Sequence, residues 1–451
     1  MSETSSQDVN SLEPEPILSD EKRIWRRLRR NISIAAVGSG ASVAIKLGQA
    51  VLLTRFLKID DYGRILIVTN LFVFLDSFLG LRVSDVIFRF FQPLKEKGDP
   101  RAVRSLVLLC LGICLTSGLL IYFGILVSSA WLAEHLYSDS RLSPLFNIYG
   151  FTLLVASFSG VYEPILRIYD RFSAIILPQL LGSLVTFGIF FGYFATIRGG
   201  EYDLRVIVVA FVIGLLIQSI PPLIKTLHLV RPFFASDKNT KPLVSHRIEL
   251  VRCLFNSNLS GYLKFAINPG DIFLLGLFSS PTQVALYGLA KQITAPLALL
   301  QTTIQTAVTP EITMLRAKNQ YKQIQAFLAR YLMAAIKFGG LLALIGLVAG
   351  RLLFLFLFAS QYSTALPVFY CLLTAAWLLL VLLLFRPLAV SLDLLKWHNL
   401  ALMFSVFVLS VLVVTHRLDA MTMAFVQLAE AALLRPAFSV LVWNRLRNMI
   451  E

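Results

Sequence analysis

The sequence predicts an all-α, polytopic membrane protein with about twelve transmembrane helices. The chain is 57% hydrophobic and only 15% charged, whereas a soluble domain carries about one quarter charged residues. Its apolar residues recur in blocks of about 20 from Ile32 almost to the C-terminus, and a helix needs ~20 apolar residues to cross the hydrocarbon layer. The blocks are continuous rather than alternating, which excludes a transmembrane β-barrel. The same composition excludes soluble enzymes, nucleic-acid binders and secreted disulfide-rich domains.

A polar segment precedes the first apolar block. Residues 1–20 are acidic and rich in Ser and Pro, without Lys or Arg, which predicts a disordered tail. Residues 21–30 are strongly basic and also carry Trp25 and Leu28, a pattern typical of a helix at the membrane surface. The first apolar block is too long to be a signal peptide.

Twelve apolar blocks follow, six in each half of the chain. We expect an N-terminal six-helix bundle over residues 31–228, a cytoplasmic linker over 229–252, and a C-terminal six-helix bundle over 253–451. The expected spans are 33–57, 65–90, 106–130, 145–165, 174–197 and 205–227 in the first half, and 253–278, 285–309, 331–358, 367–390, 399–416 and 420–443 in the second.

Lysine and arginine are distributed unequally between the two sets of loops. The loops on the side of the termini carry 26 of these residues, and the loops on the opposite side carry six. Because cytoplasmic loops are enriched in Lys and Arg, we expect both termini to be cytoplasmic, with the protein in the cell membrane. The net charge of +15 then reflects this bias and attraction to anionic lipid headgroups, rather than binding to nucleic acid.

The loops leave no room for a catalytic domain. The longest expected loops are residues 131–144 and 225–252, and no HExxH, CxxC, P-loop or GxSxG motif occurs. We therefore expect no enzyme activity, no cofactor and no metal site.

An internal repeat supports the division into halves. LLTRFLKIDDYG (Leu52–Gly63) and LLGLFSSPTQVALYG (Leu274–Gly288) each contain paired leucines, a phenylalanine, a short polar turn and a Tyr-Gly pair that opens the next helix. Transporters are commonly built from two such repeats, with the substrate site between them.

At these residues the chain resembles the polysaccharide-export flippases of the O-antigen translocase type, within the multidrug/oligosaccharidyl-lipid/polysaccharide superfamily. The resembling stretches are TRFLKIDDYGRILIVTNLF (Thr54–Phe72), the Gly80-Leu81 pair, and DIFLLGLFSSPTQVALYGLAKQITAPLALLQTTIQTAVTPEI (Asp271–Ile312). The resemblance implies two six-helix bundles around a central cavity, alternating access, and a lipid-diphosphate-linked oligosaccharide as cargo for lipopolysaccharide or related polysaccharide biosynthesis. It also implies membrane lipids and the polysaccharide polymerase machinery as partners.

Polar residues inside the first span point to a cavity. Ser42, Lys46 and Gln49 fall on one face of a helix at 100° per residue, and a lysine deep in the membrane is costly. We expect them to line a water-filled cavity where cargo binds, the alternative being a lysine satisfied by neighbouring carbonyl groups. Small residues on the opposite face, including Gly40 and Ala44, predict close helix packing there.

The seventh span carries the longest polar stripe. Four residues recur at intervals of four, with an acid three residues later, and we expect this face to line the cavity or, alternatively, to form a polar contact between the bundles. Pro269 removes a backbone donor and predicts a kink. The stripe consists of Asn256, Ser260, Lys264, Asn268 and Asp271.

The eighth span adds Lys291 to the expected substrate-binding residues, and Pro296 is a second hinge candidate. Lys291 could equally neutralise Asp271 across the helix pair, so both a substrate role and a structural role are open. Embedded carboxylates can take up protons near neutral pH when unpaired. Asp76, Asp271 and Glu430 are therefore candidates for coupling transport to an ion, although Arg435 lies about one turn from Glu430.

Four functional classes remain to be compared. A lipid-linked-oligosaccharide flippase needs a cationic cavity for its diphosphate, and Lys46, Lys264 and Lys291 outnumber the central acids. A cation-coupled multidrug-type exporter would favour an acidic cavity. A membrane-embedded transferase is disfavoured by the short loops, and a non-transporting scaffold leaves the polar stripes unexplained.

Overall fold

The computed structural model describes residues 17–79, 83–96, 98–197, 201–234, 270–317, 320–391 and 418–450, with positions 407, 408, 411 and 415 between them. Throughout this part of the chain the regular structure is helical. Eight helical segments are long and apolar enough to cross a membrane. The protein is therefore an all-α polytopic membrane protein, as the sequence predicts.

The first half begins with a helix of 40 residues. It continues through a helix pair, two long hairpins and their connecting turns. The helices are α1 (Ile17–Phe56), α2 (Ile59–Leu79), α3 (Val83–Glu96), α4 (Pro100–Trp131), α5 (Leu142–Ala156), α6 (Ser159–Ile168), α7 (Ser173–Ile197) and α8 (Leu204–Phe234), and a π-helical turn at Leu132–Leu136 extends α4.

The second half contains two π-helical turns inside long helical segments. The turn at Ala335–Gly339 joins α12 to α13, and the turn at Glu430–Leu434 joins α17 to α18. The helices are α10 (Gly270–Phe278), α11 (Pro281–Ala317), α12 (Tyr321–Ala334), α13 (Gly340–Phe356), α14 (Leu366–Val381), α15 (Phe385–Ser391), α17 (Ala420–Ala429) and α18 (Arg435–Arg447), with a 3-10 helix at Ser360–Ala365.

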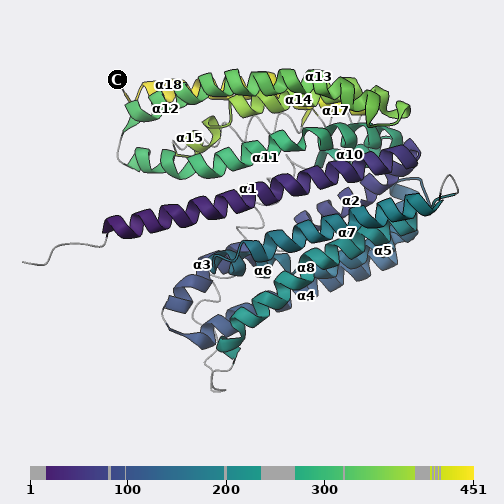
Figure 1. Cartoon of the computed structure of the whole chain (residues 1–451), viewed down its shortest axis with the longest axis horizontal. Coiled ribbons are helices and arrows are strands. Elements are labelled where there is room, and N and C mark those ends of the chain that lie inside the picture. The colour runs from purple at the N-terminus through teal and green to yellow at the C-terminus, as the bar shows by residue number, and fades with distance from the viewer. Residues whose placement is uncertain are drawn as a thin grey trace, which may run out of the picture.

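The two halves form two groups of helices, with α1 running between them (Figure 1). The groups lie together at the end that carries the α1–α2 turn and diverge toward the end that carries α12, α18 and the start of α1 (Figure 1). A shared apolar core joins the halves at the closed end and includes Tyr62, Tyr287 and Tyr362. Two further apolar cores lie separately toward the diverging end, one within each half.

Eight of the twelve expected spans coincide with segments that meet the length and hydropathy requirement. Of the other four, α2 and α11 are long helices, and α10 is the described end of span 253–278. Span 399–416 lies outside the described residues except for isolated positions. α2 and α11 pack against each other between the halves.

The expected span at 65–90 is wrong as a single helix. The structure has α2 ending at Leu79 and α3 beginning at Val83. Val83, Ile87 and Phe91 bury one face of α3 against α4 and α6. Apolar residues continue from α2 into the buried face of α3, so the hydropathy profile does not register the break between them.

The repeat identified in the sequence forms a reciprocal contact between α2 and α11. A Cβ on Gly63 would overlap the carbonyl group of Pro281 at the start of α11, and a Cβ on Gly288 would overlap the Leu66 side chain of α2. The tyrosines that precede these glycines, Tyr62 and Tyr287, are completely buried. Each Tyr-Gly pair therefore provides the close approach through which one half contacts the other.

Candidate functional site

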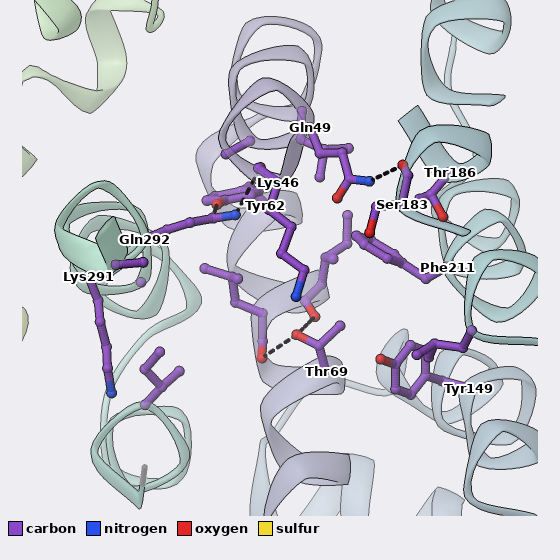
Figure 2. A pocket seen from close by; sticks show the side chains of 18 of the residues that line it. Lys46, Gln49, Tyr62, Thr69, Tyr149, Ser183, Thr186, Phe211, Lys291 and Gln292 are labelled. Atoms are coloured by element: carbon purple, nitrogen blue, oxygen red, sulfur yellow. Dashed lines mark hydrogen bonds between the residues drawn. The ribbon is translucent and has the colours of Figure 1, made fainter. Parts of the chain in front are cut away.

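A cavity of about 410 Å³ lies between the two groups of helices (Figure 2). Its walls come from α1, α2, α5, α7 and α8 of the first half and from α10 and α11 of the second. This volume suits a small ligand or part of a larger one. Three of the expected site residues, Lys46, Gln49 and Lys291, line the cavity.

Lys46 projects from α1 into the cavity (Figure 2). Its side chain is accessible, and within the described part of the chain its ammonium group has neither a hydrogen bond nor an ion pair. The backbone carbonyl of Lys46 accepts a hydrogen bond of 3.0 Å from Gln292 Nε2 of α11. One turn along α1, Gln49 Nε2 donates to the Ser183 carbonyl of α7 at 2.8 Å. A neighbouring carbonyl group thus binds Gln49, whereas no described residue binds the Lys46 ammonium group.

Other α1 residues lie differently from the sequence prediction. Ser42 is buried, is absent from the cavity wall, and has no hydrogen-bond partner for its Oγ among the described residues. The predicted small-residue face is used only in part: Gly40 has no atom nearby and Ala44 is exposed, whereas Gly48 of the same face lies against Phe187 of α7. A second close contact is made by Gly38, which meets Ile176 of α7. Gly38, Ser42 and Gln49 share one face at 100° per residue, so α1 packs on α7 through its polar side.

Lys291 is paired with Asp271, as the structural alternative proposed. Lys291 Nζ lies 2.6 Å from both carboxylate oxygens of Asp271, and Tyr287 donates to the same carboxylate at 2.7 Å. Asp271 is buried, and its carboxylate also accepts the backbone N–H of Ile272 at 2.8 Å. The pair brings no net charge to the cavity, which leaves Lys46 as the free cation of its described lining.

Five expected site residues lie outside the described residues, so the structure does not place the polar stripe of the seventh span. They are Asn256, Ser260, Lys264, Asn268 and Pro269.

The remaining ion-coupling and hinge candidates occupy three different settings. Asp76 is an accessible residue of α2, two turns beyond Thr69 of the cavity wall, and its carboxylate has no hydrogen bond within the described part of the chain. Glu430 pairs with Arg435 at 2.9 Å. The residues are five apart, and the π-helical turn at Glu430–Leu434 brings them onto one face because its hydrogen bonds span five residues.

The hinge candidate Pro296 is exposed within the continuous helix α11.

The sequence analysis missed most of the first-half wall of the cavity. Tyr149 comes from α5, Ser183 and Thr186 from α7, and Phe211 and Gln218 from α8. A signal was present, since Ser183 and Thr186 lie three residues apart on one face of an otherwise apolar helix. Tyr149 and Phe211 gave no signal, because aromatic residues are common throughout the chain.

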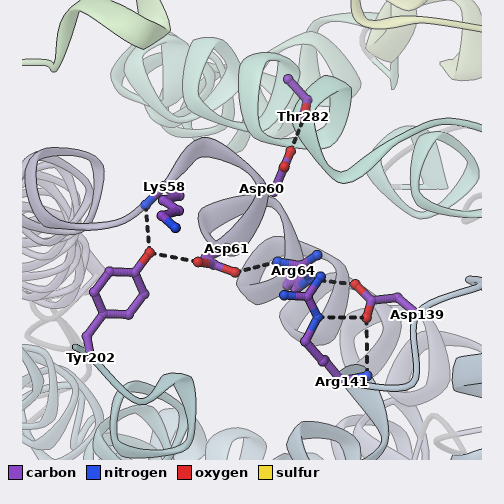
Figure 3. Close-up of polar contacts among 8 residues, drawn as sticks. All are labelled: Lys58, Asp60, Asp61, Arg64, Asp139, Arg141, Tyr202 and Thr282. Carbon is purple, nitrogen blue, oxygen red and sulfur yellow. Dashed lines mark hydrogen bonds and ion pairs between the residues drawn. The ribbon is translucent and has the colours of Figure 1, made fainter.

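A polar network holds the loops together beside the α1–α2 turn (Figure 3). Arg64 of α2 binds both Asp61 and Asp139, and Asp139 also pairs with Arg141. Asp61 accepts a hydrogen bond of 2.7 Å from the Tyr202 hydroxyl, which in turn accepts the Lys58 backbone N–H at 3.0 Å. The α1–α2, α4–α5 and α7–α8 loops are thereby fastened to one another. We call these six residues the loop network.

The loop network shifts the pKa values of its members. Burial by itself would raise the pKa of Asp139, but the hydrogen bonds and charges of Arg64 and Arg141 outweigh it and hold the pKa below its ordinary value. Burial, with a contribution from Asp61, raises the pKa of Tyr202 to about 12. At neutral pH the network therefore contains ionised Asp139 and neutral Tyr202.

Further bonds at this end connect the first half to the second. Thr282 of α11 donates to Asp60 (Figure 3), and Gln361 Nε2 donates to the Leu57 carbonyl at 3.0 Å. Arg55 Nε donates to the Leu357 carbonyl just after α13 at 2.8 Å. Tyr62 donates to Gln292 Oε1 at 3.1 Å. The cavity is therefore closed off by bonded loops at this end of the molecule.

Residues 52–367 match the family model described as "Polysaccharide biosynthesis protein". No curated protein sequence matches the chain.

Solved structures of similar fold are membrane transporters. An inward-facing multidrug resistance MATE family transporter of the MOP superfamily gives a TM-score of 0.70 at 13% identity, covering 91% of this chain and 95% of that one. An outward-facing MATE transporter gives 0.61 at 15% identity, covering 94% and 96%. A MOP superfamily transporter from Pyrococcus furiosus, described by the reverse polarity of its binding pocket, gives 0.60 at 14% identity, covering 94% and 96%. At these identities the likeness concerns the fold.

Proposed function

Because the chain belongs to the polysaccharide biosynthesis protein family and has the fold of MOP superfamily transporters, we propose that it is a flippase that moves a lipid-diphosphate-linked oligosaccharide from the cytoplasmic to the outer leaflet. The observation that carries this proposal is the ammonium group of Lys46, which faces the cavity between the halves and has no partner among the described residues. Asp271, the acid beside Lys291 of the cavity lining, is already bound by Lys291 and Tyr287.

The charge of the cavity favours an anionic cargo over a cationic one. A diphosphate brings about two negative charges, and a lysine ammonium attracts them without fixing one geometry. A cation-coupled multidrug-type exporter would need an uncompensated carboxylate in this position, and the described cavity lining has none. Binding-pocket polarity also differs between members of the superfamily, as the description of the Pyrococcus furiosus transporter indicates.

The proposed transport cycle follows from the two ends of the molecule. The helices diverge toward the end of the termini, which we place in the cytoplasm, so the sugar-diphosphate head group enters from that side while its lipid chain stays in the membrane. Opening the other side requires the bonds around the α1–α2 turn to break. Lys264 and the polar residues of its stripe, together with Lys46 and Gln49, are proposed to bind the head group, and the polymerase machinery is proposed to receive it.

Complementation tests the proposal directly. In a bacterial strain that lacks its own flippase, the wild-type protein should restore polysaccharide export and remove the accumulated lipid-linked intermediate. Lys46→Ala should lose most of this export, and Lys46→Arg should retain much of it, with export normalised to membrane protein level. Lys322→Ala is the matched control, because Lys322 is an exposed lysine of α12 outside the cavity.

Two results would overturn the proposal. Full export by the Lys46→Ala, Lys264→Ala double variant would remove the cationic-cavity mechanism. Unchanged intermediate levels in the complemented strain, combined with increased resistance to cationic toxic compounds, would favour the multidrug-type exporter instead.

A further inference from the structure

The part of the cavity wall that α5, α7 and α8 form differs in chemistry from the region around Lys46 of α1. Apart from Leu215, its side chains are aromatic, hydroxyl and amide groups, and its described lining carries no charge. We propose that this wall is a carbohydrate subsite, in which Tyr149, Gln218 and Phe211 bind the sugar nearest the diphosphate and determine which cargo is accepted. The inference rests on the proposed function, since it assumes a sugar-diphosphate head group.

Tyr149 supplies a hydroxyl group suited to binding a polar ligand. The residue is only 9% exposed, and its ring is fixed against Phe72 of α2, with ring centroids 5.0 Å apart. Its hydroxyl nevertheless points into the cavity (Figure 2) and has no hydrogen bond within the described residues. Because buried hydroxyl groups are normally hydrogen-bonded, a polar ligand is the natural partner for this group.

Gln218 offers a donor and an acceptor on the same wall. Its side chain lies over Gly182 of α7, where a Cβ would be 2.5 Å from Gln218 Cγ and 3.1 Å from Nε2. The amide therefore occupies space that only a glycine leaves open, and it too has no hydrogen bond in the described part of the chain. A side-chain amide that both donates and accepts matches vicinal sugar hydroxyls, each of which can do the same.

Phe211 supplies the apolar surface that a sugar ring also needs. Phe190 packs against it edge-on, with centroids 5.1 Å apart and an interplanar angle of 76°, which holds the Phe211 ring in place in the cavity wall. The face of an aromatic ring is its electron-rich side, and it attracts the polarised C–H groups of a pyranose. A hydroxyl and an amide without partners among the described residues thus converge with a fixed ring, from two helices of the same bundle.

The position of Lys46 gives the order of the groups in the bound cargo. Its ammonium lies between this wall and α11 (Figure 2), so a diphosphate at Lys46 places the attached sugar against α5 and α8. The volume of about 410 Å³ limits the enclosed part to a small portion of the head group. We therefore assign recognition to the first sugar and leave the rest of the oligosaccharide outside this cavity.

Complementation across several cargoes tests the subsite. The protein and its variants are expressed in a panel of flippase-deletion strains whose lipid-linked oligosaccharides differ in the sugar attached to the diphosphate. We expect the wild type to restore export in some strains only. Tyr149→Phe and Gln218→Ala should each reduce export of the preferred cargo by about five- to tenfold, the value of one hydrogen bond, and narrow the difference between strains. Tyr122→Phe is the control, because Tyr122 is a tyrosine of α4 outside the cavity lining.

The outcomes separate the subsite from the proposed function. If the wild type restores export and both variants keep its level and its preference among strains, the subsite is wrong while the flippase function stands. If the wild type restores export in none of the strains, the proposed function fails and the subsite with it. Tyr149→Phe removes one oxygen and keeps the ring contact with Phe72, so protein abundance in the membrane distinguishes lost recognition from lost folding.

Discussion

The ammonium group of Lys46 and the carboxylate of Asp271 are both embedded charges, yet they differ in what surrounds them. Lys46 has no partner among the described residues, whereas Asp271 accepts from Lys291, Tyr287 and a backbone N–H. The sequence predicted both charges in the cavity region, and left open whether Lys291 serves the cargo or Asp271. Helical periodicity gives the face of a residue but not the rotation of its neighbour, so only the structure distinguishes the two roles.

The pairing of Lys291 with Asp271 predicts a compensated double variant. Lys291→Ala leaves the Asp271 carboxylate buried and unpaired. Breaking a buried ion pair in this way destabilises a protein by about 3–5 kcal/mol, so the amount of protein in the membrane should fall. Asp271→Asn in the same chain removes the uncompensated charge and should restore part of the abundance. Quantitative immunoblotting of membranes measures this, and a double variant no more abundant than Lys291→Ala would contradict the pairing.

Asp139 predicts a pH dependence of stability at the closed end of the molecule. Its pKa is lowered in the folded state, so the stabilisation by Arg64 and Arg141 is fully present above the pKa of the unfolded chain, about 4. It is lost as the pH falls through the lower folded value. Asp139→Asn should therefore be less stable than the wild type by about 1–3 kcal/mol near neutral pH, and this difference should shrink below about pH 4.

Thermal unfolding of both proteins in detergent across this pH range measures the effect. Glu134→Gln is the control, because Glu134 is an exposed acid near the same loop. A difference between wild type and Asp139→Asn that stays constant with pH would argue against ionic stabilisation by the loop network.

Among the helices, hydropathy located most spans, while the packing faces were harder to predict. The break between α2 and α3 was missed because apolar residues continue from α2 into the buried face of α3, and only part of the predicted packing face of α1 makes close contacts. Small residues allow close approach but do not compel it, and Gly40 faces open space. The repeated Tyr-Gly pairs were the better signal, because each pair lies where α2 and α11 approach each other.

Alanine substitution should affect stability differently at Gly63, which lies at the crossing of α2 and α11, and at Gly40 of α1, which faces open space. Gly63→Ala would press a methyl group onto the Pro281 backbone, and overpacking of this kind costs about 1–3 kcal/mol. Gly40→Ala has space for the methyl group and favours the helical conformation, so it should leave stability unchanged or raise it slightly. Thermal unfolding in detergent compares them, and equal stability of the two variants would refute the close crossing.

For the whole molecule, the sequence predicted the class, the two halves and their common cavity, and the structure and the family match confirm the membrane-transporter fold. The sequence could not predict which end of the molecule is closed. That depends on long-range bonds such as Thr282 to Asp60 and Gln361 to Leu57, whose partners lie more than 200 residues apart in the chain. Asp60, which forms one of these bonds, also allows tests of the transport cycle and of the orientation in the membrane.

A reversible cross-link tests the role of the closed end in transport. In a cysteine-free background, Asp60→Cys with Thr282→Cys replaces the hydrogen bond between the halves by an oxidisable pair. Oxidation should stop transport by holding the halves together, and reduction should restore it. Transport that continues after complete cross-linking would mean that this end stays closed throughout the cycle.

Single cysteines at the same end test the orientation in the membrane. We expect a membrane-impermeant reagent added outside the cell to label a cysteine at Asp60 and to leave one at Gln320 unlabelled. The reverse labelling pattern would place the termini outside and would reverse the proposed direction of entry.

The contact between the halves at one end makes each half a lever with its pivot near the α2–α11 crossing. The 37 residues of α11 extend for about 55 Å at 1.5 Å per residue. By that geometry, a rotation of about 10° at the pivot would displace the far end of the helix by roughly 10 Å. The hydrogen bonds near the pivot thus need to shift only slightly for the distant helix ends to move far. Substitutions beside the α1–α2 turn should alter the equilibrium between conformations far more than equally conservative substitutions at the distant ends.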